Sequence, residues 1–393
     1  MSKISYEDRG VSPDKPEVEY AIADSDPGIF PGSFCHVTPD VFGDDPDFCT
    51  LMHADGVGTK STIATLLHRE TGDVRVFEGL AQDSMVMNTD DLLCVGATGP
   101  FLVSNTIGRN ARVFTKDMLR SVITGYQAFG KRMNQFNVNI QFCGGETADI
   151  GDLVKSVVID STVTTRMRRT SIIDASHARA DQVIIGLASF GRAIYEDTDN
   201  SGIGTNGLTA VRHELLAPKY RELGPDTFDP ELGEHAYIGR YSLSDEVPHS
   251  NGMTLGQALL SPTRTYLPVI KALLDEKAVR ISAMFHNTGG GLTKSLKFGS
   301  SIRYVKNSLF EMPPVFRMVC DTGNMSPRDL VRVLNLGQRY EIVCPPEDAI
   351  KVIETSQRFG IDAKIIGHTE RIDSGTEVEI TFAGETHHFR REA

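Results

Sequence analysis

The feature that most constrains the fold of this 393-residue chain is the alternation of short apolar runs with longer patterns of helical period. Apolar residues that recur at every second position indicate strands, and those that recur every three to four positions indicate helices. In the first half we predict helices at 77–95 and 115–134, and strands at 101–107, 138–142 and 157–163. The first half is therefore expected to be of mixed α/β type.

The second half repeats this mixture and is predicted to form a separate domain. A polar start followed by a β-branched apolar run at 181–189 indicates a new buried strand. Because the chain length suits two domains of ordinary size, we place a boundary near residue 175, with domains at 1–175 and 176–393. The patterns predict helices at 208–216, 264–275, 328–334 and 347–358, strands at 281–285, 315–319, 341–344 and 363–366, a surface loop or insertion at 219–250, and an added edge strand at 377–382.

The charge balance and the cysteines argue against several classes of protein. Lys plus Arg is 40 and Asp plus Glu is 52, and the resulting net charge of −12 disfavours binding to nucleic acid or to an anionic membrane. The six cysteines are far apart in the sequence, so neither a zinc site nor a disulfide framework is predicted. No signal-peptide pattern and no long apolar run is present. We therefore expect a cytoplasmic protein with reduced thiols.

A glycine-rich segment, His53-Ala-Asp-Gly-Val-Gly-Thr-Lys60, lies between a strand-like run and a helix-like run. Its glycines allow backbone N–H groups to approach a phosphate, and the following helix N-terminus adds a positive dipole. Lys60 offers a point charge to phosphate oxygens, and Asp55 offers a hard oxygen to Mg²⁺. The residue order of a Walker A loop is absent. The alternative is a tight turn with solvated polar residues.

Aspartates cluster on the helix predicted at 77–95. Asp83 and Asp90 are seven residues apart, so they share one face at a separation of about 10 Å, too far for one ion to bind both. Asp91 points in a different direction. Adjacent aspartates late in a helix oppose the helix dipole, a cost that a bound metal would relieve. The alternative interpretation is a solvated acidic face.

Three further segments combine glycines with polar residues. Gly144-Gly-Glu-Thr-Ala148 follows a predicted strand, where open α/β sheets usually bind ligands, although a strand-ending turn with a solvated Glu146 is an alternative. Gly202–Gly207 matches G-x-G-x-x-G, but the nearest strand ends too early for a dinucleotide-binding fingerprint. His286-Asn-Thr-Gly-Gly-Gly291 follows a predicted strand and suits phosphate recognition or proton transfer, or else holds a structural histidine.

The order and spacing of these motifs resemble the aminoimidazole ribonucleotide synthetase (phosphoribosylformylglycinamidine cyclo-ligase) family over about 360 residues. Single motifs are modest signals, whereas the whole series is specific. The matching segments are Ser5–Val11, Asp55–Lys60, Asp83 with Asp90-Asp91-Leu92, Gly96-Ala97, Gly144–Ala148, Leu260-Ser-Pro-Thr-Arg-Thr-Tyr266, His286–Gly291 and Ile366-Gly367.

The resemblance implies a homodimer of two α/β domains per chain, in which the N-terminal domains build a shared sheet or barrel and ATP lies near the subunit interface. It implies ATP- and Mg²⁺-dependent ring closure of formylglycinamidine ribonucleotide to aminoimidazole ribonucleotide, a ligase step of de novo purine biosynthesis. Carried over to this sequence, it implies catalytic His286 and Lys60; ATP-binding Asp55, Gly56, Gly58, Thr59, Lys60, Asp83, Gly144, Gly145, Glu146 and Thr147; substrate- or phosphate-binding Thr205, Asn206, Gly207, Gly289, Gly290 and Gly291; and Mg²⁺ ligands Asp55, Asp83, Asp91 and Glu146.

The chain departs from the family pattern at several positions. The family's His-Ser-Asn-Gly reads Gly204-Thr-Asn-Gly207, so the expected imidazole is missing. A literal His249-Ser-Asn-Gly252 occurs later, and it is either a coincidence or a compensation. The family's Phe-Asn-x-Gly-Val-Gly-Met reads Leu334-Asn-Leu-Gly-Gln-Arg339-Tyr340, which loses a glycine and gains a cation. Asp90 replaces the family's Asn. These changes affect the substrate side more than the phosphate side.

Two other functions remain open. One is an ATP-using relative that acts on another amide, thiamine-phosphate, selenium or carbamoyl substrate; such relatives lack the pairing of Asp-Gly-Val-Gly-Thr-Lys with His-x-Thr-Gly-Gly-Gly. The other is a catalytically silent nucleotide-binding or scaffold subunit, suggested by the missing imidazole at Gly204.

Overall fold

The computed structural model describes residues 9, 11, 16–277 and 279–392, and most of the Ser5–Val11 motif lies outside them. The first half forms a five-stranded sheet in the order β1-β2-β5-β3-β4. Strands β3 and β4 are parallel, and the other neighbours are antiparallel. The elements are α1 (Pro16–Ala21), β1 (Val37–Pro39), β2 (Phe48–Gly56), α2 (Lys60–Thr71), α3 (Glu78–Leu93), β3 (Phe101–Arg109), α4 (Lys116–Asn134), β4 (Ile140–Asp149) and β5 (Val157–Arg168).

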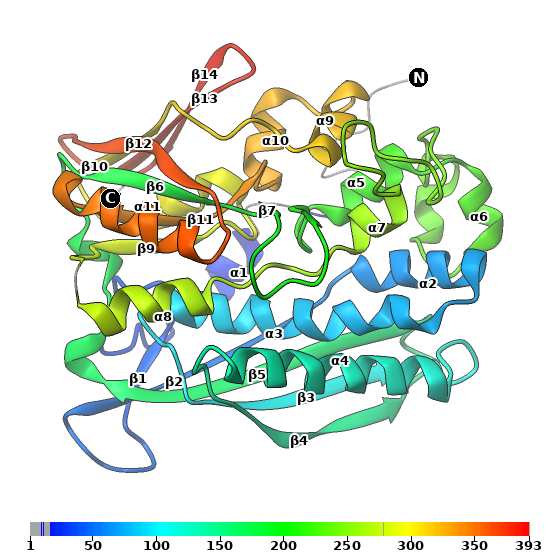
Figure 1. The fold of residues 1–393 in the computed structure, drawn as a ribbon, viewed down its shortest axis with the longest axis horizontal. Helices are drawn as coiled ribbons and strands as arrows, with labels where there is room; N and C mark the ends of the chain where they lie inside the picture. Colours follow the sequence, from blue (N-terminus) through cyan, green and yellow to red (C-terminus); the bar gives the residue numbers. More distant parts are fainter. Residues whose placement is uncertain (1–8, 10, 12–15, 278, 393) are drawn as a thin grey trace.

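The two faces of this sheet differ in their covering. Helices α3 and α4 pack on one face (Figure 1). The two helices can approach closely because Gly125 of α4 has no side chain, and a Cβ there would overlap the carbonyl oxygen of Glu78. Residues on the other face alternate with the buried ones and include large exposed apolar side chains, Met52, Leu102 and Val158, at 60%, 47% and 44% exposure. The sheet therefore has one buried face and one open face.

The second half forms a seven-stranded sheet in the order β14-β13-β10-β12-β6-β11-β9 (Figure 1). Only β10 and β13 are parallel neighbours among the strand pairs of this sheet in the described residues. The strands are β6 (Val183–Ala188), β9 (Ala283–His286), β10 (Ile302–Lys306), β11 (Gln338–Cys344), β12 (Ala363–Arg371), β13 (Thr376–Phe382) and β14 (Glu385–Arg391), and β7 (Phe190–Gly191) pairs separately with β8 (Asn200–Ser201). The domain boundary near residue 175 stays a prediction.

The helices around this sheet are mostly those that the sequence predicts. They are α5 (Leu208–Leu215), α6 (Lys219–Leu223), α7 (Leu255–Leu260), α8 (Leu267–Glu276), α9 (Pro314–Asp321), α10 (Pro327–Val333) and α11 (Ala349–Arg358). Within the described chain, no helix combines the length and apolar character that a membrane crossing requires.

Three expectations about the second half are wrong. The predicted strand at 315–319 is part of helix α9, whose apolar residues at 315, 316, 318 and 319 form one buried side. The segment 377–382 is not an edge strand, because β13 lies between β10 and β14. The segment 219–250 is not simply a surface loop, since Tyr220 and Tyr237 are fully buried in it.

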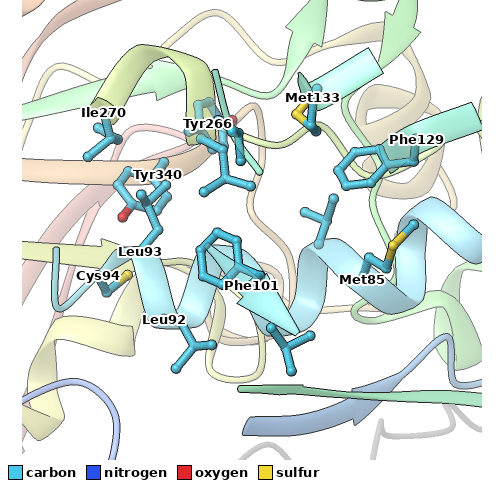
Figure 2. Packing of buried hydrophobic residues seen from close by; sticks show 14 of the residues in the cluster. Met85, Leu92, Leu93, Cys94, Phe101, Phe129, Met133, Tyr266, Ile270 and Tyr340 are labelled. Atoms are coloured by element: carbon cyan, nitrogen blue, oxygen red, sulfur yellow. The ribbon is translucent and has the colours of Figure 1, made fainter. Parts of the chain in front are cut away.

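Helix α3 joins the cores of the two halves. Most of its residues are buried, although the helix is not strongly apolar. Figure 2 shows Leu92 and Leu93 of α3 packed in the same cluster as Tyr266, Ile270 of α8 and Tyr340 of β11. The two sheets therefore share a continuous core through α3, and polar residues on this helix are held at the junction.

Candidate functional site at the domain junction

Asp83 of α3 forms a buried ion pair with Lys60, the first residue of α2. Lys60 Nζ donates to Asp83 Oδ1 at 2.8 Å and to the carbonyl oxygen of Ser261 at 2.6 Å. The same carboxylate oxygen accepts from the backbone N–H and the hydroxyl of Thr263 at 2.7 and 2.6 Å. Burial lowers the pKa of Lys60, and the charge of Asp83 opposes that shift. Lys60 is thus directed at a carboxylate inside the chain.

Asp90 lies two turns after Asp83 on α3 and binds the same segment of the chain, residues 261–266. Its Oδ1 accepts from the Thr265 hydroxyl and its Oδ2 from the Tyr266 backbone N–H, both at 2.7 Å. Burial raises the pKa of Asp90 to about 7. Asp83 and Asp90 face one segment, 261–266, as their seven-residue spacing predicts. We call these two aspartates and that segment the clamp.

Asp91 instead faces two histidines. Its Oδ1 lies 2.7 Å from His286 Nδ1, and its Oδ2 lies 3.5 Å from His53 Nε2. Burial acts to raise the pKa of Asp91, but the hydrogen bond and charge of His286, with Lys294 and His53, hold it below its usual value. The contact joins α3 to the end of β9, so the first domain orients the imidazole of the second.

Asp55 lies at the end of β2, close enough to Asp91 for the negative charge of Asp91 to raise the pKa of Asp55. Partial burial raises the pKa of Asp55, the Gly56 N–H opposes this, and the negative charges of Asp91 and Asp160 raise it further. The carboxylate of Asp55 is thus repelled by two others, Asp91 and Asp160, near the glycine-rich loop. A cation would relieve this repulsion, so the donor chemistry suits Mg²⁺.

The loop before α2 is open to a ligand. Gly58 has a φ of +57°, and a Cβ there would meet no atom within 4 Å. Thr59 makes a hydrogen bond of 3.0 Å to the hydroxyl of Thr209, the second residue of α5. The loop therefore borders the second domain and leaves the backbone at Gly58 uncovered, whereas Gly56 is covered by Asp160.

The predicted substrate-side glycine loops both contact α3. Thr205 donates to the sulfur of Met87 on α3 at 3.1 Å, and Gly207, at a φ of +77°, precedes α5. His286 contacts Asp91 as described, and a Cβ at Gly289 would meet nothing within 4 Å. Gly290 and Gly291 adopt positive φ where the 3₁₀-helix η6 (Gly291–Lys297) begins. Helix α3 thus brings together loops that are about 80 residues apart in sequence.

The segment with Gly144, Gly145, Glu146 and Thr147 lies elsewhere. It is not a loop after a strand, as expected, but part of β4, which pairs with β3 as far as Asp149. The register places Gly56, Asp160, Thr106 and Glu146 in one row across β2, β5, β3 and β4. Three strand spacings separate β2 from β4 by about 14 Å. Within one chain, Glu146 therefore does not share an ion with Asp55.

Several buried polar atoms around α3 have no hydrogen-bond partner among the described residues. Such atoms are rare in folded proteins and indicate an absent water or ligand. Those at the junction are Asp83 Oδ2, Asn206 Oδ1, His286 Nε2, Asn287 Oδ1 and Arg339 Nη1. They come from α3, the 204–207 loop and the end of β9, which the motifs predict to bind ligands, and from the start of β11, for which no such prediction was made.

These residues fit Mg²⁺ that arrives with a phosphate. Within the described ranges, no group of three His, Cys, Asp or Glu side chains is placed to hold a metal by itself. Mg²⁺ is commonly bound by one or two carboxylates plus phosphate oxygens and water. Asp55 and Asp91 supply such oxygens beside the open glycine loop.

Family models match both halves of the chain. AIR synthase related protein, N-terminal domain, matches residues 37–167, and AIR synthase related protein, C-terminal domain, matches residues 179–378. The fold and the site thus define a member of a two-domain α/β family. The chain belongs to the AIR synthase related protein family.

The chain is similar to phosphoribosylformylglycinamidine cyclo-ligases of archaea. It is 27% identical to that of Methanocaldococcus jannaschii over 322 residues, which is 82% of this chain and 78% of the relative. It is also 27% identical to that of Pyrococcus horikoshii, over 80% of this chain and 77% of the relative.

Solved structures share the fold at low identity. T. maritima PurL complexed with FGAR matches with a TM-score of 0.53 at 12% identity, over 91% of this chain and 46% of that longer chain. A chain of the HypE-HypF complex matches with a TM-score of 0.55 at 15% identity, over 95% and 99%. Thiamine-monophosphate kinase from Stenotrophomonas maltophilia matches with a TM-score of 0.51 at 13% identity, over 87% of each chain.

Sequence reasoning missed several contributors to the site. His53 was within a recognised motif, but its contact with Asp91 depends on the packing of β2 against α3. Thr263 and Thr265 belong to a recognised block, and their alternation is the signal of a segment with one face toward α3. Arg339 was noted as a departure from the family pattern, and its position could not be read from sequence.

Proposed function

We propose that this chain is an ATP-dependent ligase, a phosphoribosylformylglycinamidine cyclo-ligase, which converts formylglycinamidine ribonucleotide to aminoimidazole ribonucleotide in purine biosynthesis. The observation that carries this proposal is the match to similarly named relatives across most of both chains. It is supported by the junction of α3 with the 286–291 loop, where Asp91 contacts His286. ATP and Mg²⁺ are the expected co-substrate and metal.

Asp55, Asp91 and the loop of Gly56, Gly58 and Thr59 form the phosphate side of the proposed site. Bound Mg²⁺ would neutralise the triphosphate and polarise the phosphoryl group that is transferred. Asp55 and Asp91 are the residues that would hold it, because their negative charges act on each other and no Lys or Arg of the described residues forms an ion pair with either carboxylate. The bare backbone at Gly58 lets N–H groups approach phosphate oxygens. Lys60 contributes indirectly, by fixing Asp83 and the start of α2.

His286 is the proposed proton acceptor on the substrate side. Because Nδ1 faces the Asp91 carboxylate, Nδ1 carries the proton of the neutral ring and Nε2 presents a lone pair. Burial lowers the pKa of His286, an effect that Asp91 opposes and that Arg339 and Lys294 reinforce, so the neutral ring is favoured. Nε2 has no hydrogen-bond partner within the part of the chain that the structure describes. It is suited to accept a proton from the amidine nitrogen as that nitrogen attacks the activated amide carbon.

We also propose that the chain is a homodimer through the open face of the first sheet. Met52 and Leu102 lie in one row of that face, through Thr164 of β5. Exposed apolar side chains grouped on one sheet face mark an interaction surface. Glu146 lies at the edge of the same sheet, so a partner chain offers a route by which it reaches a shared site. A cytoplasmic location is proposed as well, in keeping with six cysteines that are all unpaired.

The dimer is tested by sedimentation equilibrium of the wild type and of Leu102→Lys. We expect a wild-type dimer and a variant whose dissociation constant rises at least about 100-fold, since a buried unpaired cation is costly. Lys at exposed position 153, as Leu153→Lys, is the matched control. A monomeric wild type, or a Leu102→Lys dimer of unchanged affinity, would contradict the proposal.

The function is tested by ADP release and by product formation. Purified protein with MgATP should release ADP only when formylglycinamidine ribonucleotide is present, and the chain should restore growth of an auxotroph that lacks this step. Substrate-independent ADP release, or no release by folded protein, would sink the proposal. The second candidate, a relative with another amide-type substrate, is favoured by the departures from the family pattern at positions 204 and 339, which affect the substrate side more than the phosphate side. It predicts ADP release with that other substrate and no complementation.

A further inference from the structure

The two main departures from the family pattern meet in space. Gly204 stands where the family has histidine, and Arg339 stands where the family has glycine. A Cβ built on Gly204 would lie 2.7 Å from Nη1 of Arg339 and would overlap its Cζ and Nη2. The guanidinium therefore occupies the space that a side chain at position 204 would enter. In this chain a basic side chain, Arg339, thus faces a glycine, Gly204.

Arg339 is fixed from several sides at the start of β11, next to a register shift in its pairing with β6. Its backbone carbonyl accepts from the Asn287 N–H at 2.7 Å, and its Nη2 donates to the carbonyl oxygen of Ile203 at 3.0 Å. The residue is 1% exposed. Arg339 thus ties the 286–291 loop to the 202–207 loop, the two segments that carry the proposed substrate-side residues.

The guanidinium also lies among the charged groups of α3. Asp83, Asp90 and Asp91 all act on it electrostatically, and it acts in turn on Lys60 and His286. One nitrogen, Nη1, is buried and has no hydrogen-bond partner in the described ranges. A guanidinium carries five donors in a rigid fork, so it can hold a carbonyl with one nitrogen and leave another directed at the site.

We propose that Gly204 and Arg339 form a reciprocal exchange, in which Arg339 supplies from β11 the basic group that the family carries at position 204 and positions the 202–207 loop for the anionic ribonucleotide. The inference rests on the proposed function for the identity of that ribonucleotide. Arg339 is a positioning residue, since it acts through Ile203 on Thr205 and Asn206. The missing imidazole is then a relocation of the basic group and not a loss of the site.

The exchange is tested by a double-mutant cycle with Gly204→His and Arg339→Gly, followed by thermal unfolding. In the wild-type background, Gly204→His should lower Tm by about 10 °C or more, because the imidazole and the guanidinium compete for one space. In the Arg339→Gly background the same substitution should cost at most about 3 °C. The left-handed φ of +69° at position 204 penalises any side chain equally in both backgrounds, so it cancels in the comparison.

Gly204→Ala serves if the histidine variant does not fold, since the Cβ alone already overlaps Arg339. A fall in Tm on substitution at position 204 that depends strongly on residue 339 supports the exchange. Equal falls in Tm in both backgrounds overturn it. This readout needs no turnover, so it decides the exchange even if the wild type releases no ADP with formylglycinamidine ribonucleotide, an outcome that would count against the proposed function alone.

The positioning role is tested by kinetics of Arg339→Lys, which keeps the charge and loses the fork. We expect KM for the ribonucleotide to rise about 10-fold while KM for MgATP changes less than about 2-fold, because the 202–207 loop lies on the substrate side. The double variant Gly204→His/Arg339→Gly should recover a ribonucleotide KM within about 3-fold of the wild type. Equal changes in both KM values, or a fall in Tm with no change in KM, would overturn the positioning role.

Discussion

The aspartates at the domain junction fall into two groups with opposite environments. In the clamp, Lys60 and the 261–266 segment hold Oδ1 of Asp83 and both carboxylate oxygens of Asp90, while Asp83 Oδ2 has no partner among the described residues. Asp55 and Asp91 lie beside an open glycine loop and repel each other, with histidine as the only basic partner within hydrogen-bond distance of Asp91 among the described residues. Neighbouring residues of one type thus serve two purposes. The clamp aspartates stabilise the junction, whereas the Asp55 and Asp91 carboxylates, which face only histidines or the loop, are available for MgATP.

The largest expected effect comes from breaking the clamp. Asp83→Ala leaves Lys60 as a buried, unpaired cation and should lower the free energy of unfolding by about 3–5 kcal/mol. Urea unfolding followed by circular dichroism measures this loss. The matched variant is Lys60→Met/Asp83→Leu, which removes both charges and should recover most of the stability. If Asp83→Ala were as stable as the wild type, the clamp would not be structural.

The next largest effect separates Asp91 from the clamp. Asp91→Asn keeps an oxygen that can accept from His286 Nδ1 but removes the charge that Mg²⁺ needs. We expect MgATP affinity to fall about 30- to 100-fold, while the free energy of unfolding changes by less than about 1 kcal/mol. Isothermal titration calorimetry and urea unfolding provide the two numbers. Unchanged nucleotide affinity would remove Asp91 from the metal site.

The smallest expected effect is a pH dependence that belongs to Asp90 alone. Its folded-state pKa of about 7 lies above the ordinary value of 3.8, so the folded state binds this proton more tightly. The stability that the proton contributes is present below pH 4 and is lost as pH rises through about 7. Wild type should therefore lose about 1–3 kcal/mol relative to Asp90→Asn between pH 4.5 and pH 8.

Unfolding curves of both proteins at several pH values measure this difference. Asp91→Asn, on the other side of the comparison, should not reproduce it. If the difference in free energy of unfolding between the wild type and Asp90→Asn stayed constant across that pH range, a charged Asp90 would not destabilise the clamp.

Local patterns were enough to predict most of the fold. Helices α3 and α4 and strands β3, β5 and β6 were predicted from the periodicity of their apolar residues, and the structure forms them at nearly the same positions. The apolar run at 315–319 was too short to separate a strand from a helix, and a proline at the first position of α9 favours the helix. Strand β4 continues through Gly144 and Gly145 because β3 pairs with it, which no local signal shows.

The site was predicted as a set of residues but not as an arrangement. The motifs singled out Lys60, Asp83 and Asp91 equally, since all three suit phosphate or metal chemistry. Which carboxylate pairs with Lys60 depends on how α2 packs against α3, and these residues are separated by 23 positions. Likewise, Gly204 and Arg339 appeared as independent departures because nothing in one sequence shows that they meet.

The most direct test of the two-group account is a crystal structure with Mg²⁺ and a nonhydrolysable ATP analogue. The account predicts a metal ion about 2.1 Å from a carboxylate oxygen of Asp55 or Asp91, with the Lys60–Asp83 ion pair intact. A metal ion bound by Asp83, with Lys60 released to contact phosphate, would contradict the account.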